Sequence, residues 1–203
     1  MENTITSIPG YRVYQYLLAI NPHQELSNQI QAIKKQFAAK FKTPLAALGK
    51  PQITLVQFLA YQMTEQKIIN RLTNIAQGIT PFKVELLDFG SFPSHTIHIN
   101  VTTKLPVQQV IKELKSAQNI MTMSKENKPH FMEEWHFTIA RKLKPWQYEQ
   151  GWLEYAHHHF SGRFIADNMV LFKRPEGETG YKQLMQFEFE NLAVNTKQGN
   201  LFM

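Results

Sequence analysis

The chain has 203 residues, 43% of them hydrophobic and 12% aromatic, a composition that excludes an intrinsically disordered protein. It has no cysteine, which excludes disulfides, thiolate nucleophiles and cysteine-based zinc sites. The net charge of +6 favours partners that carry phosphate, although it serves solubility equally well. No apolar run approaches the roughly 20 residues that span a bilayer, and the N-terminus resembles no targeting sequence, so we expect a cytoplasmic protein without membrane contact.

The first part of the chain predicts a strand, a helix, a strand and a helix. Residues 11–20 form an aromatic and branched run that an Asn-Pro pair ends. Apolar residues then recur at steps of three and four over 26–41, as on one face of a helix, and Lys34 lies off that stripe. The run 53–61 predicts the next strand, and Thr64 is a suitable N-cap for the helix that follows.

The rest of the chain adds hairpins to this alternation. The expected elements are strands 82–88 and 96–102 joined by the turn-rich FGSFPS, a helix from Pro106, a strand at 136–141, a helix at 146–159, and strands 168–174 and 181–189 around the turn PEGETG. A mixture of helices and hairpins favours an α+β fold with mostly antiparallel sheets over a doubly wound parallel sheet.

Two of the predicted strands carry a similar pattern, 84 residues apart. KPQITLVQF contains Gln52 and Thr54, and EWHFTIAR contains His136 and Thr138 at the corresponding positions. Because side chains alternate along a strand, each polar pair lies on one face, with apolar residues on the other. Either motif alone is common in half-exposed strands, but the shared offset indicates two similar lobes, which we take as one bilobed domain over residues 1–203.

Together the two motifs resemble the 2H phosphoesterase superfamily, in particular its 2'-5' RNA ligase-like and cyclic phosphodiesterase branch. HFTIAR is similar to an intact second His-x-Thr motif, whereas KPQITL is similar to a first motif in which Gln52 occupies the place of the histidine. The likeness extends to the opening strand and helix, the FGSFP turn and the VLFKR strand. It implies two pseudo-symmetric lobes with helices outside and a central groove, and RNA or a small nucleotide phosphodiester as the partner.

The resemblance also implies the chemistry of the groove. In this family one histidine takes a proton from water or a ribose hydroxyl, the other protonates the leaving oxygen, and the Thr or Ser hydroxyls hold the phosphate without metal or other cofactor. These roles would fall to His136, Thr138 and Thr54, but Gln52 cannot exchange a proton near pH 7. Losing one acid or base typically costs about 100- to 10,000-fold in rate. Three alternatives remain: a slow phosphodiesterase or ligase, an enzyme with a relocated imidazole, or a non-catalytic RNA- or nucleotide-binding module.

His98 is the candidate for a relocated imidazole. In SHTIHINV it shares the polar face of its strand with Thr96 and Asn100, while Ile97 and Ile99 form the apolar face. If that polar face lines the groove, His98 could stand near the position of the missing histidine. A histidine that is only hydrogen-bonded or hydrated is the simpler alternative.

Five further positions are candidates for substrate contact. Tyr14 and Tyr16 share a face of the first strand and could stack on a base or ribose, or pack in the core. Arg141 falls on the face opposite the motif histidine if its strand is regular, where it would pair with a carboxylate or contact a phosphate. Lys173 and Arg174 are weaker candidates for a phosphate contact.

The remaining histidines suggest less. His130 precedes the second motif, where a lid could form, and His23 reads as the start of a helix. Residues 157–159 are three consecutive histidines, which point in different directions on a helix and so do not predict a metal site.

Overall fold

The described part of the chain forms two antiparallel sheets. The computed structural model describes residues 11–192, so most of the N-terminal stretch judged for a targeting sequence lies outside it. One sheet has the strand order β5-β2-β1-β8-β9 and the other β6-β4-β3-β7. Both are accompanied by helices, which confirms the predicted α+β class with mostly antiparallel sheets.

The predicted elements occur in the predicted order along the chain. The first sheet comprises β1 (Val13–Ile20), β2 (Ile53–Tyr61), β5 (His130–Phe131), β8 (Asn168–Pro175) and β9 (Lys182–Glu188). The second sheet comprises β3 (Phe82–Phe92), β4 (Thr96–Val101), β6 (His136–Arg141) and β7 (Ser161–Ala166). The helices are α1 (Gln24–Lys40), α2 (Glu65–Gln77), α3 (Lys104–Lys115), α4 (Gln118–Met121) and α5 (Pro145–Tyr155), with short 3-10 helices η2 (Pro44–Ala47) and η3 (Gln62–Thr64).

Some elements differ from the sequence-based expectation. The strands β5 and β7 and the short helix α4 were not predicted. The last helix was expected to continue to residue 159 but ends at Tyr155, because the consecutive histidines that follow are weak helix formers. Strand β3 also continues through Phe92, so part of the expected FGSFPS turn belongs to the sheet.

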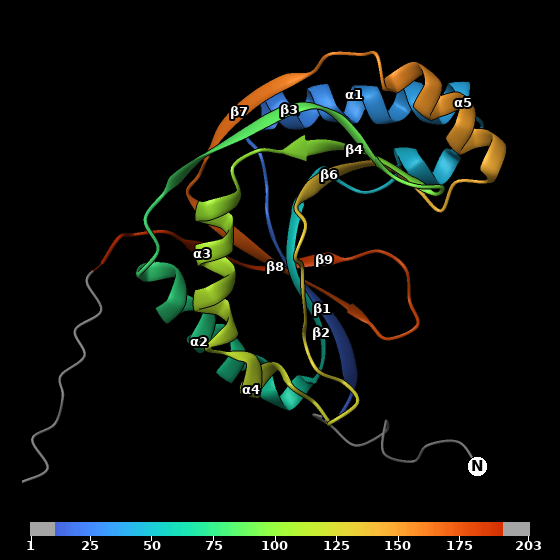
Figure 1. Ribbon diagram of the computed structural model, residues 1–203. Helices are drawn as coiled ribbons and strands as arrows, with labels where there is room; N and C mark the ends of the chain where they lie inside the picture. Colours follow the sequence, from blue (N-terminus) through green and yellow to red (C-terminus); the bar gives the residue numbers. More distant parts are fainter. Residues whose placement is uncertain (1–10, 193–203) are drawn as a thin grey trace, which may run out of the picture.

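Two helices pack away from the sheet whose strand precedes them in the chain. Figure 1 shows α1 and α5 over the sheet formed by β3, β4, β6 and β7, and α2 and α4 beside the other sheet. Helix α1 follows β1 of the first sheet but packs on β6 and β7 of the second, and α3 follows β4 of the second sheet but lies beside α2. The chain order β1-α1-β2-α2 therefore corresponds to β4-α3-β6-α5, except that α4 and β5 are inserted between α3 and β6. Each motif strand pairs with the first strand of its series, β2 with β1 and β6 with β4.

A single glycine lets α1 and α5 approach the second sheet. Gly151 in α5 is buried, and a Cβ built there would lie 2.8 Å from Cζ of Phe37 in α1 and 3.1 Å from Cδ1 of Ile97 in β4. Both neighbours are fully buried, so they have little room to move. The close packing of these three elements depends on the missing side chain.

We expect Gly151→Ala to destabilise the protein, although alanine is the better helix former. Overpacking of a filled core typically costs about 1–3 kcal/mol, which exceeds the gain in helix propensity. Urea unfolding of the variant checks this, with the exposed neighbour Gln150→Ala as control. A Gly151→Ala protein as stable as the control would mean that α5 does not pack as closely as described.

Candidate functional site

In the first sheet, the motif residues lie on the face away from α2. The hydroxyl of Tyr16 in β1 donates a hydrogen bond of 2.8 Å to the Glu65 carboxylate at the start of α2, which marks the helix-covered face. Ala19 is three residues beyond Tyr16 in β1, so its side chain points to the opposite face. Thr54 pairs with Ala19 and therefore shares this uncovered face. Alternation along β2 places Gln52, one step before the strand, on the same face as Thr54.

In the second sheet, the motif residues lie on the face away from α5. Ile97 of β4 lies beside Gly151 of α5, which marks the covered face. His98 therefore points away from α5, and its partner across the sheet is Thr138. The next pair on that face joins Asn100 and His136.

The chain passes from one sheet to the other directly before the second motif. Phe131 of β5 pairs with Val56 of β2, and the Met132 N–H donates a 2.9 Å hydrogen bond to the Leu55 carbonyl. Only four residues later the chain enters β6 at His136, and β2 and β6 contact each other. The two motif strands thus contact each other, and we call the polar residues on their helix-free faces, together with His98, the inter-sheet site: Gln52, Thr54, His98, His136 and Thr138.

Within this site two imidazole rings lie in contact. The ring centroids of His98 and His136 are 4.6 Å apart, and Phe92 at the end of β3 lies 4.6 Å from the first ring and 5.0 Å from the second. Gly90 pairs with His98, and a Cβ there would lie 2.6 Å from its Nε2. Gly90 and Phe92 both come from the FGSFP segment, so the resemblance pointed to this segment without showing what it does.

Burial keeps both imidazoles neutral. It lowers the pKa of His136 to about 4, and a charge on His98 acts in the same direction. Burial also lowers the pKa of His98, although Asn100 and the Glu134 carboxylate oppose the change. The Nδ1 atoms of both rings are buried and, among the described residues, without a hydrogen-bond partner, so a proton added there would be buried unsatisfied.

The contact between the two imidazoles limits what His98 can do. Acid and base in an in-line displacement at phosphorus must stand on opposite sides of the phosphate, and rings 4.6 Å apart leave no space for one between them. The structure therefore places His98 on the same side as His136. The motif position of the first sheet that corresponds to His136 is occupied by Gln52, an amide.

A buried lysine fixes the segment that leads into the first motif. Lys34 of α1 is only 5% exposed, and its Nζ donates hydrogen bonds of 3.0 and 2.8 Å to the carbonyls of Leu48 and Gly49. Burial lowers its pKa to about 8, and the charge of Arg141 acts in the same direction. The expectation that Lys34 lies off the buried stripe was wrong, because these two carbonyls satisfy the ammonium inside the protein.

Arg141 lies on the opposite face from the one predicted for a regular strand. Strand β6 has a bulge: Thr138 pairs with His98 and Ala140 with Ile97, so Ile139 has no partner. One extra residue reverses the alternation, and Arg141 points to the same side as His98. Its side chain is therefore directed toward the inter-sheet face.

The predicted aromatic platform lies elsewhere. Tyr16 is fully buried and stacks on Phe58 with ring centroids 5.2 Å apart, so it offers no face to a ligand. Tyr14 shares its face, with Nζ of Lys173 5.0 Å from its ring. Lys173 in turn pairs with Glu65 at 2.8 Å. The alternative of core packing describes Tyr16, and this whole cluster lies on the α2 side of the sheet.

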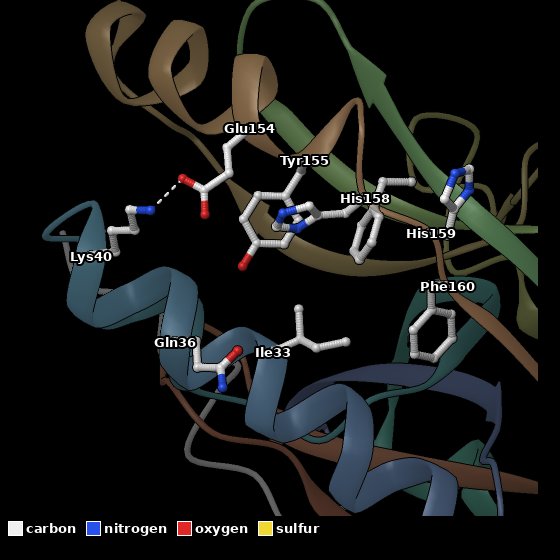
Figure 2. A pocket seen from close by; sticks show the side chains of 9 residues that line it. Ile33, Gln36, Lys40, Glu154, Tyr155, His158, His159 and Phe160 are labelled. Atoms are coloured by element: carbon white, nitrogen blue, oxygen red, sulfur yellow. Dashed lines mark ion pairs between the residues drawn. The ribbon is translucent and has the colours of Figure 1, made fainter.

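Other histidines are not among the five residues of the inter-sheet site. His130 of β5 pairs with Gln57 of β2, and the strand registers place both on the same sheet face as Thr54. Nδ1 of His23 accepts the Leu26 N–H as the N-cap of α1. A cavity of about 480 Å³ lies between α1 and the end of α5. Figure 2 shows His158 and His159 among the residues that line it. None of the five residues of the inter-sheet site lines this cavity.

The sequence model of the 2'-5' RNA ligase superfamily matches residues 22–178, which include both motifs and strands of both sheets. The chain belongs to the 2'-5' RNA ligase superfamily. Its membership agrees with the resemblance to 2H phosphoesterases drawn from the two motifs. No curated protein matches the chain.

Solved structures of the same fold cover nearly the whole chain. TT0787 of Thermus thermophilus has a TM-score of 0.61 at 15% identity, over 87% of this chain and 98% of its own. E. coli LigT gives 0.59 at 16% identity in complex with NADP+, over 88% and 99%, and 0.57 at 17% identity in complex with 3'-AMP, over 88% and 98%. Among residues 11–192, no helix is long and apolar enough to cross a membrane.

We expect His136 to remain neutral down to about pH 5 and to take up a proton near pH 4. Because histidine in the unfolded chain titrates near 6.5, the unfolded state binds more protons between these values, and the free energy of unfolding should rise by about 3 kcal/mol from pH 4 to 6.5. Ring resonances followed by NMR, and urea unfolding at several pH values, measure both effects. His136→Gln should reduce the rise; titration of His136 near 6.5 would contradict the burial described.

Proposed function

We propose that the inter-sheet site binds the phosphodiester of RNA or of a small nucleotide, such as a 2',3'-cyclic phosphate or a 2'-5' linkage, and turns it over slowly. The observation that supports the proposal is the contact between β2 and β6, whose registers place Thr54 and Thr138 on the faces of their sheets that the helices leave uncovered. Two threonine hydroxyls from different sheets and one neutral imidazole suit a phosphate held between the sheets. In this proposal the chain acts as one bilobed domain.

Each residue of the site has a distinct role in this proposal. Thr54 and Thr138 donate hydrogen bonds to phosphate oxygens, and His136, being neutral, accepts the proton of the attacking water or ribose hydroxyl. The new P–O bond forms as the bond to the leaving ribose oxygen breaks. Gln52 donates a hydrogen bond to the phosphate but cannot supply a proton, so the leaving oxygen takes one from solvent. This last step makes the reaction slow.

The nucleotide complexes of structural neighbours support this ligand class. LigT of E. coli has been crystallised with 3'-AMP, with NADP+ and with ATP. Those ligands share a ribose and phosphate, which is the chemistry that the hydroxyls of the inter-sheet site would recognise. The absence of cysteine further fits a reducing compartment, and we place the protein in the cytoplasm on that ground.

The second candidate function is a non-catalytic RNA- or nucleotide-binding module. Both imidazoles of the site come from one sheet, and the pKa of His136 is lowered by burial, so the free protein has no protonated imidazole there at pH 7. A site of this kind can bind phosphate through hydroxyls and amides alone. Turnover separates the two functions.

We expect Gln52→His to raise hydrolysis of 2',3'-cyclic nucleotides by roughly 100-fold or more, because it restores the missing proton donor next to Thr54. Initial rates with adenosine 2',3'-cyclic monophosphate measure the change. Gln52→Glu is the control, since it alters the same position without adding an imidazole.

Two histidine variants give the other arms of this experiment. His136→Ala should abolish the remaining turnover while leaving a folded protein. If His98→Ala removes wild-type turnover and Gln52→His adds nothing, then the essential imidazole is His98 and our assignment is wrong. If every variant is inert but binds nucleotide, the binding-module alternative holds.

A further inference from the structure

Arg174 carries a positive charge that no described carboxylate neutralises. On the face of β8 toward α2, the neighbouring Lys173 pairs with Glu65 at 2.8 Å. Arg174 lies on the opposite face and pairs with Gln15 across the sheet. Its partners are neutral: Nε donates to Oε1 of Gln15 at 2.8 Å, and the guanidinium lies 4.6 Å from the ring of Tyr181. Within residues 11–192 it forms no salt bridge.

Arg141 of the other sheet also lies on the inter-sheet face. The bulge at Ile139 turns it to the inter-sheet face, where it is exposed and, among the described residues, also without a carboxylate partner. The charges of both arginines act on Tyr181: burial raises the pKa of this phenol, and Arg174 and Arg141 oppose that rise. Tyr181 is in contact with the Arg174 guanidinium, and Arg141 extends from β6 of the other sheet.

Arg141 is close in register to the inter-sheet site. Arg141 pairs with Thr96, and Thr138 pairs with His98, two residues further along β4. Two residues of a strand span about 7 Å, so the backbone of Arg141 lies about that far from the backbone of Thr138. An extended ligand with its phosphodiester at Thr138 could reach the arginines with another anionic group.

We propose that Arg141 and Arg174, with Tyr181 and Gln15 holding Arg174 in place, form a second phosphate subsite for the same ligand. This rests on the proposed function and makes it more specific. Guanidinium groups bind phosphate through paired, charge-assisted hydrogen bonds, and the neutral partners of Arg174 leave its charge free for an incoming anion. The preferred ligand then has at least two phosphates, as an oligonucleotide or a phosphorylated nucleotide has, rather than one cyclic phosphate.

Calorimetric titration of the full chain with two probes tests this subsite. The first probe is adenosine 2',3'-cyclic monophosphate, and the second is a 5'-phosphorylated diadenylate that ends in a 2',3'-cyclic phosphate. We expect the wild type to bind the second probe about 10-fold more tightly or better, the usual worth of a charge-assisted contact. Arg174→Gln should remove most of that preference and leave the affinity for the first probe unchanged.

A matched control and a second variant keep this test decisive. Arg163→Gln removes the same charge from an exposed position on β7 and should preserve the preference. Should Arg174→Gln fail to fold, Tyr181→Ala, which leaves Arg174 without its ring contact, must weaken the preference instead.

The outcomes separate the subsite from the proposed function. Equal affinity of the wild type for both probes, or an unchanged preference in Arg174→Gln, overturns the subsite and leaves the proposed function standing. Binding of neither probe by folded protein overturns the proposed function itself.

Discussion

The site depends on the alternation of side chains in each motif strand, which directs apolar residues into the core and polar residues to the face that the helices leave uncovered. In β2, Ile53 and Leu55 are fully buried, and in β6, Phe137 and Ile139 are fully buried. Burial of each such side chain is worth about 1.5–3 kcal/mol, which fixes the rotation of both strands and turns the polar residues away from the helices. The passage of the chain from β5 into β6 then brings the two motif strands into contact.

The two lobes share this geometry but differ in their chemistry. Thr54 pairs with Ala19 in the first sheet as Thr138 pairs with His98 in the second. Because the first motif has Gln52, both imidazoles of the inter-sheet site, those of His98 and His136, come from the second sheet. There Phe92 and His98 surround His136 and keep it neutral, and Gly90 leaves the space that His98 occupies. Binding of a phosphate could be shared by both lobes, whereas proton transfer by imidazole is confined to one.

The local part of this arrangement could be predicted from the sequence. Strand 53–61 was predicted with the bounds that the structure gives, and the face that His98 shares with Asn100 follows from alternation. The contact between His98 and His136 could not be predicted, because strand order within a sheet is set by long-range packing. Arg141 was placed on the wrong face because the bulge at Ile139 has no signature in the sequence.

The burial of polar groups was equally hard to predict. Lys34 looked like a surface residue, yet it is buried with two backbone carbonyls as its partners. Tyr16 looked like a stacking platform, yet its hydroxyl reaches the Glu65 carboxylate inside the protein. Lys34 is buried by contact with backbone carbonyls, and Tyr16 by contact with a residue 49 positions away in the sequence. Neither kind of contact can be recognised from the pattern of residue types along the chain.

A crystal structure of the wild-type protein with a non-hydrolysable dinucleotide tests the central claim most directly. The account predicts a phosphate within hydrogen-bond distance of the Thr54 and Thr138 hydroxyls, with His136 on one side of the phosphorus and Gln52 on the other. A phosphate bound in the cavity beside His158 and His159 instead, or one that contacts only a single threonine with Gln52 turned away, would contradict it.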